Sequence, residues 1–240
     1  MAIAHRKYLV ILSLVFGVWW VFLSIAPLDR HAWLMENLLV FGAAAFLLGF
    51  HRKLLFSRVS YTLIFIFMML HQVGAHYTYA EVPYDAWFES LTGRTFNSLV
   101  GWERNNFDRV IHFSYGLLLA YPIREVFLRV ADVRGFWGYF LPLDLTMSTS
   151  MLFELLEWLV AEVFGGDLGQ AYLGTQGDIW DAHKDMALAA LGALIAMLVT
   201  VALNSRYQRD FNREWVESLR VKHKAPLGED ALAKMTKKKK

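Results

Sequence analysis

Six long apolar stretches constrain the fold of this chain more than any other feature of its sequence. A helix that crosses the hydrocarbon core of a bilayer needs about 20 mainly apolar residues. The six stretches are Tyr8–Pro27, Trp33–Phe50, Val59–Tyr77, Val110–Val130, Phe136–Phe164 and Ala182–Leu203. The apolar content of 56% exceeds the roughly 45–50% of a typical globular domain. We therefore expect an all-α membrane protein with a bundle of about six transmembrane helices.

The distribution of lysine and arginine predicts the orientation of these helices. Cytoplasmic loops of membrane proteins carry an excess of basic residues. With both termini in the cytoplasm, that side holds 19 of the 24 Lys and Arg residues, and the other side holds Arg30, Arg94, Arg104, Arg109 and Lys184. We expect a multi-pass protein with cytoplasmic N- and C-termini. The net charge of +2 gives no indication of nucleic-acid binding.

The loop over residues 78–107 is too polar to span a membrane. Its apolar side chains favour a short helix at the outer membrane interface. They are Trp87, Phe88, Leu91 and Phe96.

The chain becomes basic after residue 205. Tyr207, Phe211, Trp215 and Leu219 recur every four residues, which favours an amphipathic helix on the cytoplasmic leaflet. We therefore expect two regions, a six-helix transmembrane domain over residues 1–205 and a basic cytoplasmic tail over 206–240. The final Lys237–Lys240 run fits contact with anionic lipid, and it fits a plain disordered tail at least as well.

Ionisable side chains in and beside the apolar stretches are the second informative pattern. Such residues are costly in a membrane and generally face a partner or a water-filled cavity. In the predicted orientation, five of the six helices bring acids or histidines to the outer half of the bilayer. The residues are Glu36, His71, His76, Asp108, His112, Glu154, Glu157, Asp178, Asp181, His183 and Asp185. This layer predicts a shared polar site.

The spacing of these residues brings several of them onto common helix faces. Asp108 and His112 are four residues apart, and Glu154 and Glu157 are three apart. The three aspartates within residues 178–185 follow i, i+3, i+7 and predict one acidic stripe along two turns. Carboxylates and imidazoles that converge between helices bind divalent metals, and they also suit proton transfer.

These patterns predict a divalent metal at this layer, with Zn²⁺, Mn²⁺ or Fe²⁺ favoured over Mg²⁺ because imidazole accompanies the oxygens. The candidate ligands are His71, His76, Asp108, His112, Glu154, Glu157, Asp178, Asp181 and Asp185. The candidate catalytic residues are Glu154, Glu157 and His112.

Structural interpretations compete with this one for each residue taken singly. Asp178 fits a helix N-cap after Gly177, and the helix dipole favours Asp181. His71 and His76 fit simple hydrogen bonds between helices. The isolated Gly74 and Gly116 fit close helix packing.

Three motifs of the chain carry a family resemblance. They are N-N-F-D-R-V-I-H-F at residues 105–113 with Gly116, E-L-L-E-W at 154–158, and L-G-T-Q-G-D-I-W-D at 173–181 continuing to Asp185-Met186. Together with His76-Tyr77-Thr78-Tyr79 before Val82-Pro83, they resemble the YjdF-like bacterial inner-membrane proteins. The resemblance implies a polytopic protein of the bacterial inner membrane and supplies no reaction, since the activity of that family is unassigned.

Three functions fit the polar layer. The first is a metal-dependent membrane enzyme acting on a lipid or another amphiphile from the outer side. The second is an ion- or proton-coupled transporter, and the third is a non-catalytic membrane component whose polar layer only stabilises the bundle. The chain has no cysteine, no G-x-x-x-x-G-K-[ST] phosphate loop and no G-x-S-x-G nucleophile motif, which excludes thiolate chemistry and disfavours nucleotide and serine-hydrolase chemistry.

Overall fold

The computed structural model describes residues 2–164, 175–222, 226, 228–229 and 234–236, and all regular secondary structure within them is helical. The helices are α1 (Ala2–Ser24), α2 (Arg30–Phe50), α3 (Arg58–Tyr77), α4 (Tyr84–Thr92), α5 (Phe96–Val100), α6 (Phe107–Val130), α7 (Trp137–Phe164), α9 (Asp181–Tyr207) and α10 (Phe211–Ser218). The prediction of an all-α protein is confirmed.

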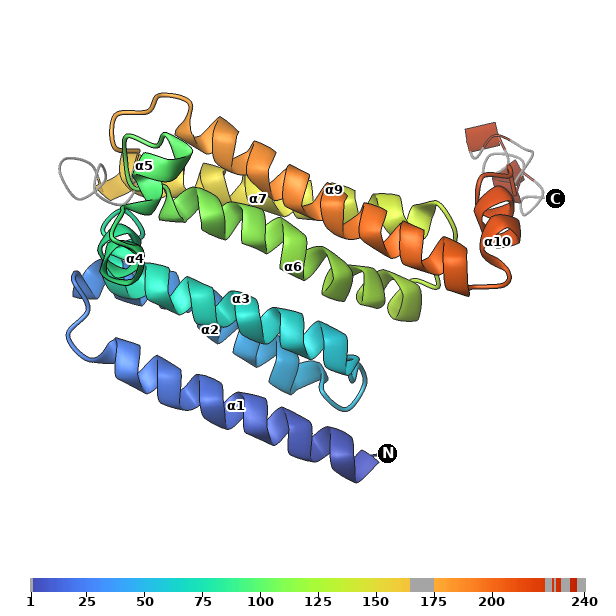
Figure 1. Cartoon of the computed structure of the whole chain (residues 1–240). Coiled ribbons are helices and arrows are strands. Elements are labelled where there is room, and N and C mark those ends of the chain that lie inside the picture. Colours follow the sequence, from blue (N-terminus) through green and yellow to red (C-terminus); the bar gives the residue numbers. More distant parts are fainter. Residues whose placement is uncertain (1, 165–174, 223–225, 227, 230–233, 237–240) are drawn as a thin grey trace.

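Six of the described helices have 20 residues or more, and they run alongside one another in alternating directions (Figure 1). The start of α1 and helix α10 lie at one end of this array, and α4 and α5 lie at the other. Among the described residues, four helices are long and apolar enough to cross a membrane, namely α2, α3, α9 and the part of α1 from His5.

Helices α6 and α9 form the most extensive helix pair of the structure. Their backbones approach closely because each contributes a glycine to the contact. A Cβ atom added at Gly116 would lie 1.9 Å from the carbonyl oxygen of Ala189, and one at Gly192 would lie 2.2 Å from that of Phe113. The close packing predicted for Gly116 is therefore confirmed. Small residues permit this approach between membrane helices, where packing drives association.

Helix α3 packs on α6, and the turn that follows α3 directs a side chain toward the bundle. Thr78 and Tyr79 adopt left-handed backbone conformations, with φ of 57° and 53°. The ring of Tyr79 lies so close to Gly74 that a Cβ atom there would be 2.4 Å from it. Close helix packing was predicted for Gly74, but its contact is with this tyrosine of the following turn and not with another helix.

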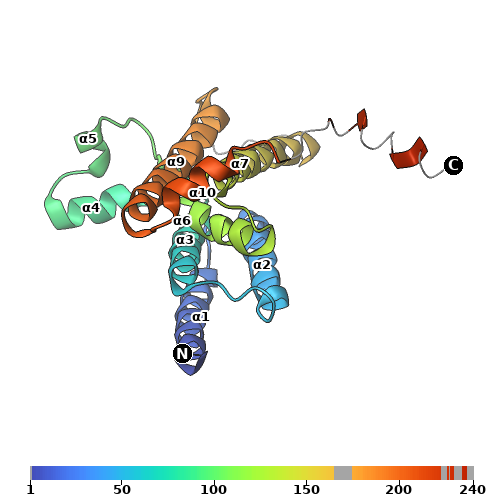
Figure 2. The same ribbon diagram turned by 90° about the vertical axis from the view of Figure 1, so that its right-hand side faces the viewer.

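Helices α1 and α2 are peripheral, as the view along the array shows (Figure 2). Helix α1 packs on α3. Helix α2 starts after Asp29, whose carboxylate accepts the backbone N–H groups of His31 and Ala32 and so caps the helix. Within the described part of the chain, α2 packs mainly on α3, and this interface is much smaller than that between α6 and α9.

The loop predicted to form a short interfacial helix contains two helices, α4 and α5. Gly93 separates them, because it adopts a left-handed conformation with φ of 76° and its N–H donates to the Glu89 carbonyl at the end of α4. Phe96, expected in the same helix as Trp87, begins the second one instead.

The amphipathic segment of the tail forms α10, which docks on the start of α7. Phe211 and Trp215 contact the ring of Tyr139, and the indole of Trp137 donates to the Ser218 carbonyl at 2.9 Å. Tyr207 and Leu219, expected on the same apolar face, are exposed. The Lys237–Lys240 run lies outside the described residues.

Candidate functional site

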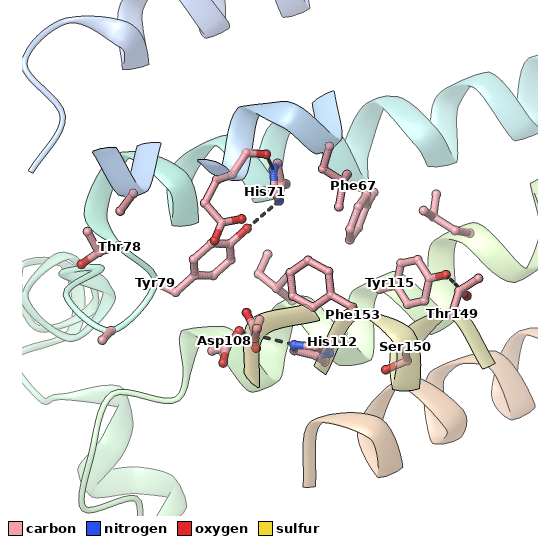
Figure 3. Close-up of a pocket in the computed structure, with 17 residues that line it drawn as sticks. Phe67, His71, Thr78, Tyr79, Asp108, His112, Tyr115, Thr149, Ser150 and Phe153 are labelled. Carbon is pink, nitrogen blue, oxygen red and sulfur yellow. Dashed lines mark hydrogen bonds and ion pairs between the residues drawn. The ribbon is translucent and has the colours of Figure 1, made fainter. Parts of the chain in front are cut away.

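A cavity of about 230 Å³ lies between α2, α3, α6 and α7, at the end of the array that carries α4 and α5 (Figure 3). Its wall is polar toward this end and apolar farther along the helices. The polar side chains are Glu36, His71, Thr78, Tyr79, Asp108, His112, Thr149, Ser150 and Glu157. Four of the six long helices therefore contribute to one polar chamber.

A compact group of acids surrounds a histidine at one wall of the cavity, which Asp108 and His112 line. Donor atoms of Asp108, His112 and Asp185 all lie within 4.8 Å of one another. His112 Nε2 is 3.6 Å from Asp108 Oδ1 and 3.3 Å from Glu154 Oε1. We call Asp108, His112, Glu154 and Asp185 the carboxylate–histidine cluster. It joins residues of α6, α7 and α9.

The cluster is largely buried, with Asp108 half-buried, and it is incompletely paired. Asp185 is 2% exposed, and the side chain of Glu154 is 9% exposed. Asp185 Oδ1 and Glu154 Oε1 have no hydrogen-bond partner within the described part of the chain. Three carboxylates thus face a single imidazole, and none forms an ion pair with a described lysine or arginine. A divalent cation would compensate this charge, since buried carboxylates otherwise require protons or a partner.

Two of the predicted ligands belong instead to an ion-pair network beside the cluster. Asp181 pairs with Arg104 and Arg109, and Asp178 pairs with Arg109 and with Lys184. The Lys184 ammonium lies 2.5 Å from Asp178 Oδ2, and this contact is the main reason why the pKa of Asp178 falls from its ordinary 3.8 to about 2, with help from the Trp180 N–H. These aspartates have cationic partners already.

The acidic stripe predicted over residues 178–185 is wrong in one respect. Helix α9 begins at Asp181, so Asp178 lies in the preceding turn, after Gly177 with its φ of 84°. Asp178 is also no N-cap of α9, because that position is Trp180. Asp181 and Asp185 do share a helix, one turn apart. Asp181 pairs with arginines, whereas Asp185 lies in the carboxylate–histidine cluster.

The opposite wall of the cavity carries a second polar group. Tyr79 places its hydroxyl 2.5 Å from His71 Nδ1, and His71 Nε2 lies 3.2 Å from the backbone carbonyl of Glu36 (Figure 3). The Glu36 side chain is 8% exposed and lines the same cavity. His71 therefore faces the chamber but belongs to a different group from the carboxylate–histidine cluster.

The remaining predicted residues are placed separately. Glu157 lines the cavity one turn beyond Glu154. His76 Nδ1 lies 2.8 Å from the Leu23 carbonyl at the end of α1, and it does not line the cavity. The hydrogen bond between helices that we considered for His76 is thus present.

Three residues of this region were not among the predicted metal ligands or catalytic residues. Arg104 precedes the helix and looks like an ordinary loop charge, so its pairing with Asp181 has no local signal. Tyr79 is part of the H-Y-T-Y run and Glu36 is part of the polar layer, but only the fold brings both onto the cavity wall.

Comparisons with known proteins agree with a membrane assignment. Residues 8–206 match the model of a family described as predicted membrane protein, DUF2238. The inner membrane protein YjdF of Escherichia coli (strain K12) is 34% identical over 192 residues, which cover 80% of this chain and 88% of that protein. No solved structure matches the chain.

Proposed function

Because the chain belongs to the DUF2238 family of predicted membrane proteins, we propose that it acts inside the bacterial inner membrane as a metal-dependent enzyme on an amphiphilic substrate. The site would lie in the outer half of the bilayer, at the polar chamber. The observation that carries this proposal is the carboxylate–histidine cluster, two of whose residues, Asp108 and His112, line the cavity.

The proposed topology is six spans with both termini in the cytoplasm. The six long helices alternate in direction, and the start of α1 lies at the same end as α10 (Figure 1). The excess of basic residues at that end, 19 against five, supports its assignment to the cytoplasm. A reporter fused after Lys240 should then read cytoplasmic, and one inserted at Ser90 should read periplasmic. The opposite readings would place the polar chamber in the inner leaflet.

The donor set supports a transition metal. Oxygen and imidazole ligands bind such ions at about 2.0–2.2 Å, so atoms already within 4.8 Å of one another need only small side-chain rotations to share one ion. Asp108, His112 and Asp185 are the first candidates, and Glu154 is the fourth. A nitrogen among the oxygens favours Zn²⁺, Mn²⁺ or Fe²⁺ over Mg²⁺.

The chamber supports a division of roles. A metal held by the cluster would polarise a carbonyl or phosphoryl oxygen of the substrate or activate a water molecule. Glu157 lines the cavity without belonging to the cluster, which suits a proton acceptor for that water. His112 would serve as a neutral ligand, and Glu154 would orient it through the 3.3 Å contact.

The transporter interpretation has less support. The neighbouring cavity, which continues toward the cytoplasmic end, has an apolar wall. Asp144 lines neither cavity and is exposed. The wall of this second cavity therefore offers an ion no polar path beyond the chamber.

Thermal unfolding with and without chelator tests the metal. Binding stabilises a fold by about 2.7 kcal/mol when the ligand is at 100 times its Kd, so a chelator should lower Tm and re-added Mn²⁺ or Zn²⁺ should restore it. Asp185→Asn should remove this response. Glu162→Gln, at an exposed acid on the same helix as Glu154, should keep it.

Turnover is tested with the same proteins in proteoliposomes of bacterial lipid extract. Mass spectrometry of the lipids should reveal a metal-dependent change that is absent with Asp185→Asn. A protein that binds metal but leaves every lipid unchanged would support the non-catalytic interpretation.

A further inference from the structure

A second cavity of about 350 Å³ lies next to the polar chamber. The two cavities share Tyr115 and Leu119 in their walls. All 13 residues around the second cavity have apolar or aromatic side chains. The one hydroxyl among them, on Tyr115, is hydrogen-bonded to Thr149 at 2.5 Å. The polar chamber and this apolar cavity are therefore adjacent, and we call the two together the groove.

The groove has a side that faces away from the bundle. Leu39 and Phe46 of α2 line it and are 38% and 43% exposed, and Leu145 of α7 lines it and is 40% exposed. Within the described residues α2 contacts mainly α3, through a small interface, and it does not pack on α7. In a bilayer, the opening between α2 and α7 would face lipid chains.

The groove is long enough to hold one acyl chain of a lipid. Its wall follows α6 from Asp108 to Phe127, a distance of about 28 Å at 1.5 Å per residue. The hydrocarbon core of a bilayer is about 30 Å thick and contains two layers of chains. An extended lipid chain therefore fits beside α6 with its polar end in the chamber.

We propose that this groove binds one membrane lipid, which enters between α2 and α7 and places one acyl chain along α6 and its head group in the polar chamber. This inference rests on the proposed function for the role of the head group, which would present an oxygen to the metal. No lysine or arginine lines the chamber within the described residues, so the metal and the Tyr79–His71 pair would supply the head-group contacts.

Photolabelling tests the groove directly. The protein is reconstituted in phosphatidylethanolamine vesicles that contain the same lipid with a diazirine near the end of one acyl chain. Labelling should concentrate on groove residues of α6 such as Ile123 and Val126, above the level on outward-facing residues such as Leu198. Equal labelling of both surfaces, as by ordinary surrounding lipid, would overturn the proposal.

Filling the groove provides matched variants. Ala43→Phe places a ring in the groove, and Ala44→Phe places one on the exposed face of the same helix. We expect Ala43→Phe to lower labelling of Ile123 about tenfold, equivalent to 1.4 kcal/mol of binding, and Ala44→Phe to leave it unchanged. The pair Leu47→Trp and Leu48→Trp repeats the comparison if Ala43→Phe fails to fold. Unchanged labelling in the folded groove variants would contradict the proposal.

The chelator response of Tm, measured on the same samples, separates this inference from the proposed function. Groove labelling without any metal response would keep the lipid site and remove the metal enzyme. A metal response without groove labelling would keep the metal enzyme and remove the lipid site.

Discussion

Replacing Gly116 with alanine should both destabilise the bundle and weaken metal binding. Cβ atoms essentially never lie closer than 3.0 Å to another heavy atom, and here the new one would be 1.9 Å from the Ala189 carbonyl oxygen. The backbones of α6 and α9 must therefore separate by at least about 1.1 Å. Overpacking of this kind costs about 1–3 kcal/mol. For a chain of this size, that corresponds to a fall in Tm of about 2–12 °C.

The same displacement reaches the carboxylate–histidine cluster, because Asp108 and His112 lie on α6 and Asp185 on α9. Metal–ligand distances tolerate about 0.2 Å, so a shift of this size should weaken metal binding more than tenfold, or by over 1.4 kcal/mol.

Differential scanning fluorimetry in detergent and isothermal titration with Mn²⁺ measure the two effects. Gly42→Ala is the control, since nothing lies within 4 Å of its Cβ position and alanine favours a helix by up to about 1 kcal/mol over glycine. Equal Tm values and metal affinities for the two variants would refute the argument.

The remaining predictions concern polar contacts. Tyr79→Phe removes the partner of His71 Nδ1 and should lower stability by about 1–3 kcal/mol in thermal unfolding; an unchanged Tm would show that this hydrogen bond contributes little. Arg104→Gln leaves Asp181 with Arg109 alone and should lower stability by up to about 3 kcal/mol. The fall of Tm on addition of chelator should persist in this variant. Loss of that response would place Asp181 in the metal site. The pKa of Asp178 is lowered to about 2 in the folded protein, so its stabilising contribution is complete above about pH 4 and is lost as the pH falls toward 2. Asp178→Asn should therefore flatten the dependence of Tm on pH over this range. An unaltered dependence would contradict this prediction.

Much of the fold follows from hydropathy. The apolar stretches overlap the six long helices, and the fourth, predicted as Val110–Val130, differs from α6 only by the addition of Phe107–Arg109. The family resemblance is confirmed as well. Hydropathy succeeds because a helix satisfies all its backbone hydrogen bonds within one segment, whatever its neighbours are.

The site was harder to predict because spacing describes only one helix at a time. It correctly brought Asp108 and His112 onto one face of α6. It could not separate Asp181, which Arg104 and Arg109 neutralise, from Asp185, which is one turn away and unpaired. That distinction depends on which loop residues pack against α9, and no local pattern contains this information.

The metal content of the purified protein tests the central claim most directly. Wild-type protein, Asp185→Asn and Glu162→Gln are purified in detergent without chelator, and bound metals are quantified per chain by inductively coupled plasma mass spectrometry. The cluster predicts close to one transition-metal ion per chain in the wild type and in Glu162→Gln, and loss of that ion in Asp185→Asn. A wild-type protein that holds no stoichiometric metal, and takes up none when Zn²⁺, Mn²⁺ or Fe²⁺ is added, would contradict the account.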